Sequence, residues 1–290
     1  MPVHFVLHLA SILAAAIVVA GAPDTKTWLS VAFALGFAHY LLSILYSGRQ
    51  IRQLFEQPQV IVPLLWIGLV GAALYLLKFP LILYFAFHHA FNTAYILNDT
   101  IKKDDELVRA FRGSSVWLHL FIYLVLLRSN SPLDNLAPGA LFAGVAVGYI
   151  VFFYYLYRLR TRLDARSLIE NCGFELLSIG AIAASFYFDF KFLQVVLYHF
   201  IFWAFYPAWK LAHGGIPRLA RYLALTGACI AFFWAVSPIG LVSYRLIGSP
   251  FEEQFYLWSY IHITTSLMLS NAHPAWIVGL FRPRRLTKAA

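Results

Sequence analysis

The sequence has few charged residues. Only 12% of its 290 residues are Asp, Glu, Lys or Arg, and 61% are hydrophobic, whereas soluble domains carry roughly 25% charged residues. This shortage excludes a chain with a sizeable soluble domain and predicts an integral membrane protein. We expect a single transmembrane domain over residues 1–290. Its compact loops favour the bacterial inner (plasma) membrane over an organelle membrane.

Cysteine and the motifs of phosphate-binding or nucleophilic enzymes are scarce as well. Cys172 and Cys229 are the only cysteines, which excludes a disulfide framework and a cysteine-based metal site. No Gly-rich phosphate loop or nucleophile elbow is present. The net charge of +9 would suit nucleic acid, but the Lys and Arg residues stand in short loops between apolar runs, as topology determinants do. Nucleic acid is therefore not an expected partner, whereas membrane lipids are.

Long apolar runs recur along the whole chain. Because a membrane span needs roughly 20 apolar residues, the sequence predicts an all-α, polytopic protein with about ten transmembrane helices and no strands. The first run lacks a basic segment before it, so we expect it to remain as a span and not to act as a cleaved signal. The expected spans are residues 4–22, 27–47, 59–77, 79–97, 114–128, 138–157, 172–188, 190–212, 219–237 and 254–280.

Basic residues cluster after every second expected span, whereas the alternate connections are short and poor in charge. The positive-inside rule then places the basic loops and both termini in the cytoplasm. Two span pairs also resemble each other, because residues 64–68 lead to His88 much as residues 176–180 lead to His199. This similarity predicts degenerate helical-hairpin repeats.

Four histidines stand within apolar runs, and a histidine in hydrocarbon is costly enough that it usually has a partner and a function. Their expected spans all run from outside to inside. Each histidine falls about 8–12 residues from the outer end, which at about 1.5 Å per residue puts all four near mid-membrane. The pattern predicts one metal site with four ligands, namely His39, His88, His199 and His262.

Polar residues on the same helical faces are candidates to orient the ligands or to contact substrate. Residues four and seven positions after each histidine share its face, which favours His88 over the adjacent His89 as the ligand. The one notable carboxylate within the spans, Glu175, is expected to orient a histidine. His119 stands alone on a span of opposite direction, and we interpret it as structural or as a substrate contact; His4 and His8 are interpreted as structural or interfacial. The further candidates from the spacing are Ser43, Tyr46, Asn92, Tyr95, Tyr206 and Ser266, of which the tyrosines are interpreted mainly as packing residues.

The residue types favour iron among the metals that imidazole binds, which include Zn, Cu, Fe and Ni. Zinc hydrolases usually pair histidine with a carboxylate, and carboxylates are scarce in these spans. Non-haem iron with open coordination positions suits an oxygenase that combines dioxygen with a lipophilic substrate, and the 18% aromatic content suits a tunnel for a long or polyene molecule.

Other functions remain open from the sequence. Bis-histidine ligation of haem b would make the protein an electron carrier. A histidine proton relay near the midplane would suit a transporter. A membrane acyltransferase would need one histidine and a neighbour such as Asn92.

The segment Gly36-Phe37-Ala38-His39 resembles the early Gly-x-Pro-His motif of the bacterial and archaeal membrane β-carotene dioxygenases related to the Brp and Blh proteins. Here Ala38 replaces the proline, and the acidic residue that usually follows is absent. A middle-span histidine of that family corresponds to His88, whereas its closely spaced late histidine pair is not reproduced. The resemblance implies a polytopic fold, iron held by histidines from several spans, and cleavage of a carotenoid with dioxygen.

Overall fold

The structure is a computed structural model that describes residues 3–46, 61–97, 101, 105–237 and 251–269. The side chains of a few helix-end residues, among them Tyr46 and Tyr95, are outside this description. The basic clusters that follow the second and tenth expected spans also lie outside the described residues.

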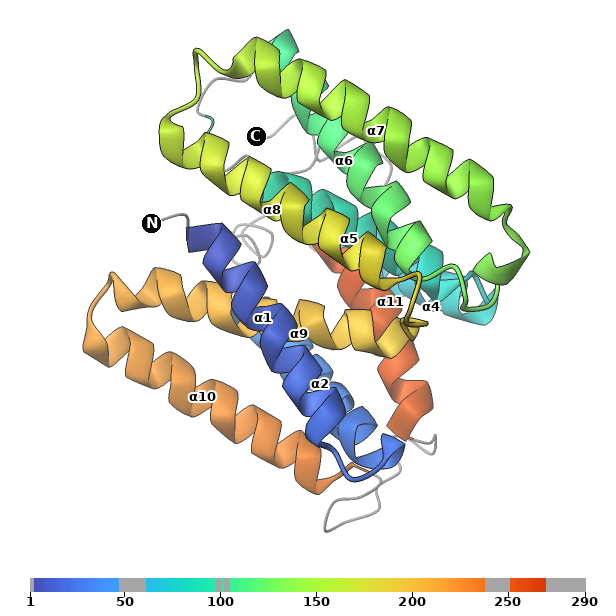
Figure 1. The fold of residues 1–290 in the computed structure, drawn as a ribbon. Helices are drawn as coiled ribbons and strands as arrows, with labels where there is room; N and C mark the ends of the chain where they lie inside the picture. The colour runs from blue at the N-terminus through green and yellow to red at the C-terminus, as the bar shows by residue number, and fades with distance from the viewer. Residues whose placement is uncertain (1–2, 47–60, 98–100, 102–104, 238–250, 270–290) are drawn as a thin grey trace. The chain divides into compact units, whose positions relative to one another are not determined.

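Helices account for all the regular structure in the described ranges, which contain no strand (Figure 1). Each expected span overlaps one described α-helix. The α-helices are α1 (Val3–Gly21), α2 (Thr25–Tyr46), α4 (Ile61–Leu76), α5 (Leu81–Leu97), α6 (Glu106–Leu126), α7 (Pro138–Leu159), α8 (Ala165–Ala184), α9 (Phe192–Ala212), α10 (Ile216–Ala235) and α11 (Phe251–Leu269), with a short 3-10 helix at Leu133–Asn135. Six of them, α1, α2, α7, α8, α9 and α10, are long and apolar enough to cross a membrane. The all-α prediction is therefore confirmed for the described residues, and the apolar helices fit a membrane protein.

An aspartate caps the N-terminus of two of these helices, α6 and α8. The Asp105 carboxylate accepts a hydrogen bond of 3.1 Å from the backbone N–H of Val108, and Asp164 accepts one of 2.7 Å from Ser167. Each bond satisfies one of the N–H groups that the first turn of a helix leaves without a backbone partner. The N–H of Val108 lowers the pKa of the Asp105 carboxyl below its ordinary value, and the side chain of Ser167, followed by its N–H, does the same for Asp164, because these hydrogen bonds stabilise the charged form. Both caps therefore fix where α6 and α8 begin.

The helices gather into two compact units. Unit 1 comprises residues 1–13 and 82–195, and unit 2 comprises residues 14–81 and 196–290. We describe each unit by itself. The expectation of a single domain over 1–290 stays a prediction.

Unit 1 is built around the pairing of α6 with α7, which run side by side (Figure 1). Phe111 of α6 and Phe152 of α7 are fully buried, with ring centroids 5.2 Å apart. Gly148 permits the close approach, since a Cβ there would lie 3.2 Å from the Cα of Leu118. The third main helix, α8, packs against α6 and carries the buried carboxylates of the unit, Glu170 and Glu175.

Unit 2 is built around α2 and α11. Helix α2 packs against α10 and α11, and α11 packs against α4. Gly71 of α4 lies against the backbone of α11, where an added Cβ would meet the Cα of Ile261 at 3.0 Å and its backbone nitrogen at 3.2 Å. The absence of a side chain at Gly71 thus sets the distance between these two helices.

Replacement of Gly71 by alanine should destabilise unit 2. The new methyl group must push α11 away, and overpacking of this kind costs about 1–3 kcal/mol. Gly68→Ala is the matched control on the same helix, because nothing lies within 4 Å of its added Cβ and alanine gains up to about 1 kcal/mol of helix propensity. Thermal unfolding in detergent should give a lower midpoint for Gly71→Ala than for Gly68→Ala. Equal midpoints would contradict the close approach.

Candidate functional site

The four predicted ligands are divided between the two units. His39 on α2, His199 on α9 and His262 on α11 belong to unit 2, whereas His88 on α5 belongs to unit 1. The common depth of all four therefore stays a prediction, and the geometry of each unit is considered separately.

His39 and His262 face each other directly. Their Nε2 atoms are 3.1 Å apart, and the ring centroids are 4.7 Å apart. The Ser43 hydroxyl donates its proton to the carbonyl of Tyr40 at 2.8 Å and lies 3.2 Å from Nδ1 of His262. Because a hydroxyl has one proton to donate, Ser43 must accept the Nδ1 proton of His262. Nε2 of His262 is therefore the lone-pair nitrogen, and it points at His39.

Aromatic side chains enclose this pair. The Tyr40 ring stacks on His262 with centroids 4.8 Å apart, and its hydroxyl is 2.6 Å from Oγ of Ser259. Phe200 and Trp203 of α9 lie 5.4 and 6.3 Å from the His39 ring. The pair is thus set in a largely apolar wall whose polar contacts are directed at particular ring atoms.

The spacing of the two nitrogens fits a shared metal ion. Nitrogens bound to one metal at about 2.0–2.1 Å lie about 2.9–3.4 Å apart at the angles of octahedral and tetrahedral sites, and the observed 3.1 Å falls within this range. The same distance also suits an N–H···N hydrogen bond from His39 to the lone pair of His262. The pair can therefore exist in a metal-free and a metal-bound form with little movement of its atoms.

His199 lies beside the pair without completing a site. Its ring centroid is 5.4 Å from that of His39, with the two rings nearly perpendicular at 84°. Within the described ranges, no group of three or more His, Cys, Asp or Glu side chains has the geometry to hold a metal. Rotation of the His199 side chain would be needed to bring a third nitrogen to the pair.

His88 is engaged by its own helix. Its Nε2 is 3.0 Å from Nδ2 of Asn92, so the contact expected from the four-residue spacing is present. As an amide NH₂ donates, it occupies the lone pair that Nε2 would offer to a metal. The adjacent His89 stacks on Tyr123 with centroids 4.3 Å apart, and its Nδ1 is 3.4 Å from Oγ1 of Thr93. Both histidines are buried.

The remaining candidates have various environments. Ser43 contacts an imidazole, but on the neighbouring helix and not at His39 one turn away. Half-buried Ser266 makes no hydrogen bond that is recorded among the described residues. Tyr206 is buried and stacks on Phe202 at 5.7 Å, as expected of a packing residue. The side chains of Tyr46 and Tyr95 are outside the described part of the chain.

A second polar constellation lies inside unit 1. Nε2 of His119 is 3.0 Å from Oε1 of Glu175, and both side chains are only 1% exposed. Oγ of Ser115 lies 3.2 Å from Nδ1 of the same ring. A hydroxyl, an imidazole and a carboxylate in this order resemble the parts of a hydrolytic triad, but Ser115 is 0% exposed, so a substrate has no access to it.

Several contacting residues were not among the sequence candidates. Tyr40, Ser259, Ser115, Thr93 and Glu170 all make buried polar contacts. The sequence signal that could have identified some of them is a serine or threonine four residues from a histidine on the same helix, as with Ser115 and His119. Contacts between helices, such as that of Tyr40 with Ser259, leave no such signal.

Comparison with protein-family models, with curated proteins and with solved structures gives no match to this chain.

Replacement of Ser43 by alanine should remove the preference of His262 for the tautomer protonated at Nδ1. In the wild-type protein, nitrogen NMR of labelled histidine should show Nδ1 of His262 protonated and Nε2 unprotonated, because Ser43 accepts the Nδ1 proton. Ser43→Ala should give a mixture of tautomers. Ser266→Ala, on the same helix as His262, should give the same spectrum as the wild-type protein. A wild-type spectrum with Nε2 of His262 protonated would contradict the hydrogen-bond assignment.

Proposed function

We propose that the protein is a membrane-embedded non-haem iron oxygenase in which His39 and His262 supply the first two metal ligands. The observation that carries the proposal is the 3.1 Å between their Nε2 atoms, together with the Ser43 contact that leaves the lone pair of His262 directed at the gap. Imidazole nitrogen suits iron. The iron, when bound, would supply the redox chemistry that activates dioxygen. His199 and His88 are the proposed further ligands.

The wall of the site supports a lipophilic substrate. Tyr40, Phe200 and Trp203 lie around the histidines, and α2 and α9 are mainly apolar. Such a wall excludes water and binds flat or extended apolar molecules, because their transfer from water is favourable. Polyenes, including carotenoids, are therefore the first substrate class to test.

Haem fits the pair less well than a single ion. Axial ligands on opposite faces of a haem iron are separated by two metal–nitrogen bonds, or about 4 Å. The Nε2 atoms of His39 and His262 are 3.1 Å apart, which leaves no room for a porphyrin between them as they stand. The geometry thus favours non-haem iron over the haem b alternative.

Single replacements of His39 or His262 by alanine should abolish iron retention. The wild-type protein, purified in detergent, should carry stoichiometric iron by mass spectrometry and show no haem absorption band. Each alanine variant removes one of the four proposed ligands, and water in its place binds the metal more weakly. Ser43→Ala should weaken iron affinity about 10- to 100-fold, since groups that orient ligands contribute to this extent.

The control for these variants is Ser266→Ala, which should retain wild-type iron. Full iron content in His39→Ala or His262→Ala would place the metal elsewhere. A wild-type protein that takes up no iron under reducing conditions would refute the oxygenase, and an intense haem band would favour electron transfer.

We further propose that the chain crosses the membrane ten times in degenerate hairpin repeats, with both termini and the basic loops in the cytoplasm. The junction of α7 and α8 supports this orientation, because Arg160 and Arg162 stand in the connection, with Arg158 in the last turn of α7 and Arg166 in the first turn of α8, and such clusters stay inside. A bacterial inner membrane is the proposed location.

Cysteine labelling in intact cells tests the orientation. In the full chain, Tyr187→Cys, at a position 84% exposed beyond the end of α8, should react with a membrane-impermeant maleimide. Arg160→Cys, also at an exposed position, should react only after the cells are opened. The wild-type chain gives the background from its two native cysteines. The reverse pattern would invert the topology.

A further inference from the structure

The interior of unit 1 is unusually polar for a membrane-spanning bundle. Its histidines on three helices and two glutamates on α8 are all at most 3% exposed; they are His4, His8, His88, His89, His119, Glu170 and Glu175. A polar group buried without a partner costs several kcal/mol in such surroundings, and ionisable groups inside membrane helices commonly mark ion or proton pathways. Apart from His88, proposed above as a further iron ligand, the members of this set are not among the proposed metal ligands, and the His39–His262 pair belongs to unit 2.

The His119–Glu175 pair can take up one proton without rearrangement. With the carboxylate ionised and His119 neutral, Nε2–H donates to Oε1, the Ser115 hydroxyl donates to Nδ1, and the pair carries one negative charge. After uptake of one proton the pair is neutral: Glu175 is a carboxylic acid whose O–H at Oε1 donates to Nε2, and the neutral imidazole carries its proton on Nδ1 and donates it to Ser115. A serine hydroxyl rotates between donor and acceptor roles, so the 3.0 and 3.2 Å contacts serve both states.

The second carboxylate oxygen is held less firmly than the first. Oε2 of Glu175 is buried and meets no hydrogen-bond partner at full geometry within the described ranges, and the Tyr149 hydroxyl lies close enough to interact with this carboxylate. Among the described residues no Lys or Arg is paired with Glu175, so no fixed cation holds this carboxylate permanently ionised.

The surroundings of the pair contain further titratable groups. His8 of α1 and His89 of α5 lie within electrostatic range of His119. Tyr123 of α6, Tyr149 of α7 and Cys172 of α8 lie within range of Glu175. None of these brings a permanent positive charge, and the charge of the pair therefore depends on the proton that it holds.

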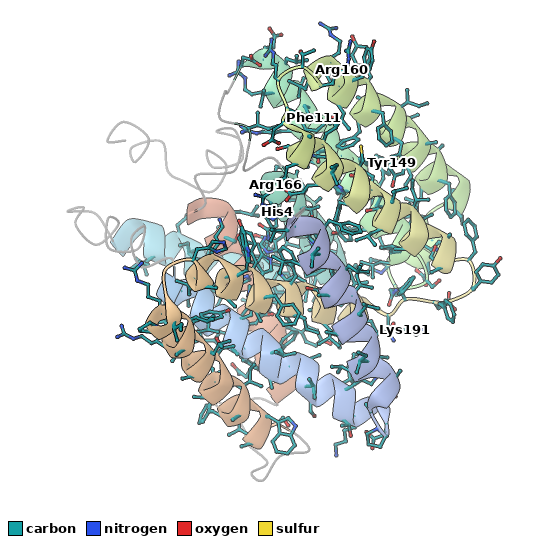
Figure 2. All side chains as sticks on the ribbon, turned by 60° about the vertical axis from the view of Figure 1, so that its left-hand side comes forward. His4, Phe111, Tyr149, Arg160, Arg166 and Lys191 are labelled. Carbon is teal, nitrogen blue, oxygen red and sulfur yellow. The ribbon has the colours of Figure 1, made fainter. Side chains whose placement is uncertain are left out.

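A series of ionisable groups leads from the N-terminal end of α8 toward this pair. Arg166, near the start of α8 and half exposed, donates to Oε1 of Glu170 at 3.1 Å, and Nε2 of His4 is 3.8 Å from Oε2 of Glu170. Figure 2 shows Arg166 and His4 close together at this end of unit 1. His8 follows His4 by one helical turn, on the same face of α1. The rings of His8 and His119 both pack on Phe174, with centroids 4.5 and 5.3 Å from it.

The His119–Glu175 pair lies well inside α8, so the series runs from the start of this helix toward its middle. Glu175 stands eleven residues after Asp164, the residue that caps α8, so it lies about 16 Å along the helix from that end. This is about half the hydrocarbon thickness of a bilayer. A proton held by Glu175 would therefore be held about three turns into α8.

We propose that His119 and Glu175 form a proton-binding site of unit 1, loaded from the Arg166 end through Glu170, His4 and His8. The reaction is the addition of one proton to the Glu175–His119 pair from water at the end of the series, and its release by the reverse path. It changes the charge of the pair from −1 to 0 and needs no oxidant or reductant. The site is independent of the iron proposed for unit 2.

Infrared difference spectroscopy of the full chain in lipid, treated with a chelator and perfused between about pH 5 and about pH 8, tests the proposal. The wild-type protein should show a reversible carbonyl band from a protonated, non-hydrated carboxyl group. Glu175→Gln, which keeps the shape and a hydrogen bond to His119, should lose that band. Glu253→Gln, at an exposed position of α11, should keep it. Glu170→Gln should keep the band but slow its appearance after a pH jump.

His119→Gln is a second test that does not depend on the folding of Glu175→Gln. The glutamine amide can donate to the carboxylate but cannot take up a proton. The carboxyl band should therefore titrate at least about one pH unit away from the wild-type midpoint, a tenfold change in proton affinity. A wild-type spectrum without a pH-dependent carboxyl band, a band that persists in Glu175→Gln, or an unchanged midpoint in His119→Gln would each overturn the proposal and leave a static hydrogen bond. Because the chelated protein is used, failure here leaves the iron proposal intact.

Discussion

An imidazole inside an apolar helical bundle needs a polar partner, and both units depend on this requirement. The cost of an unsatisfied buried polar group is comparable to the stability of several packed side chains. In unit 2 the partners are another imidazole and a serine, at 3.1 and 3.2 Å. In unit 1 they include a carboxylate and a serine, at 3.0 and 3.2 Å. In each unit at least one histidine is therefore paired with a side chain of another helix.

The chemistry available to each unit follows from the side chain that is paired with its histidine. Two neutral imidazoles offer lone pairs, and a metal cation requires ligand atoms that are deprotonated in this way. An imidazole and a carboxylate instead share a proton and change their net charge when that proton leaves. One chain therefore contains a pair suited to a metal ion and a pair suited to a proton, and the two are built from different helices.

Small residues allow these pairs to form. A Cβ on Gly36 would lie 2.5 Å from the ring of Phe255 and 2.7 Å from that of Phe200, so glycine at this position lets both rings pack on α2 one turn before His39 and Tyr40. Gly71 similarly lets α4 contact the backbone of α11. Ser43 is short enough to accept from His262 across the gap between α2 and α11 while it still donates to its own helix.

The sequence by itself determined the helical class, the positions of the helices and which histidines stand inside them, because apolar runs of sufficient length form helices wherever the backbone cannot bond to water. It also identified contacts within one helix, such as that of His88 with Asn92, since a spacing of four residues fixes the shared face. Only the tertiary structure decided that Ser43 serves His262, that Glu175 meets His119 and that three of the four predicted ligands share a unit. These pairings depend on the rotation and distance of neighbouring helices, which are set by side-chain packing between segments far apart in the chain and leave no periodic pattern in the sequence.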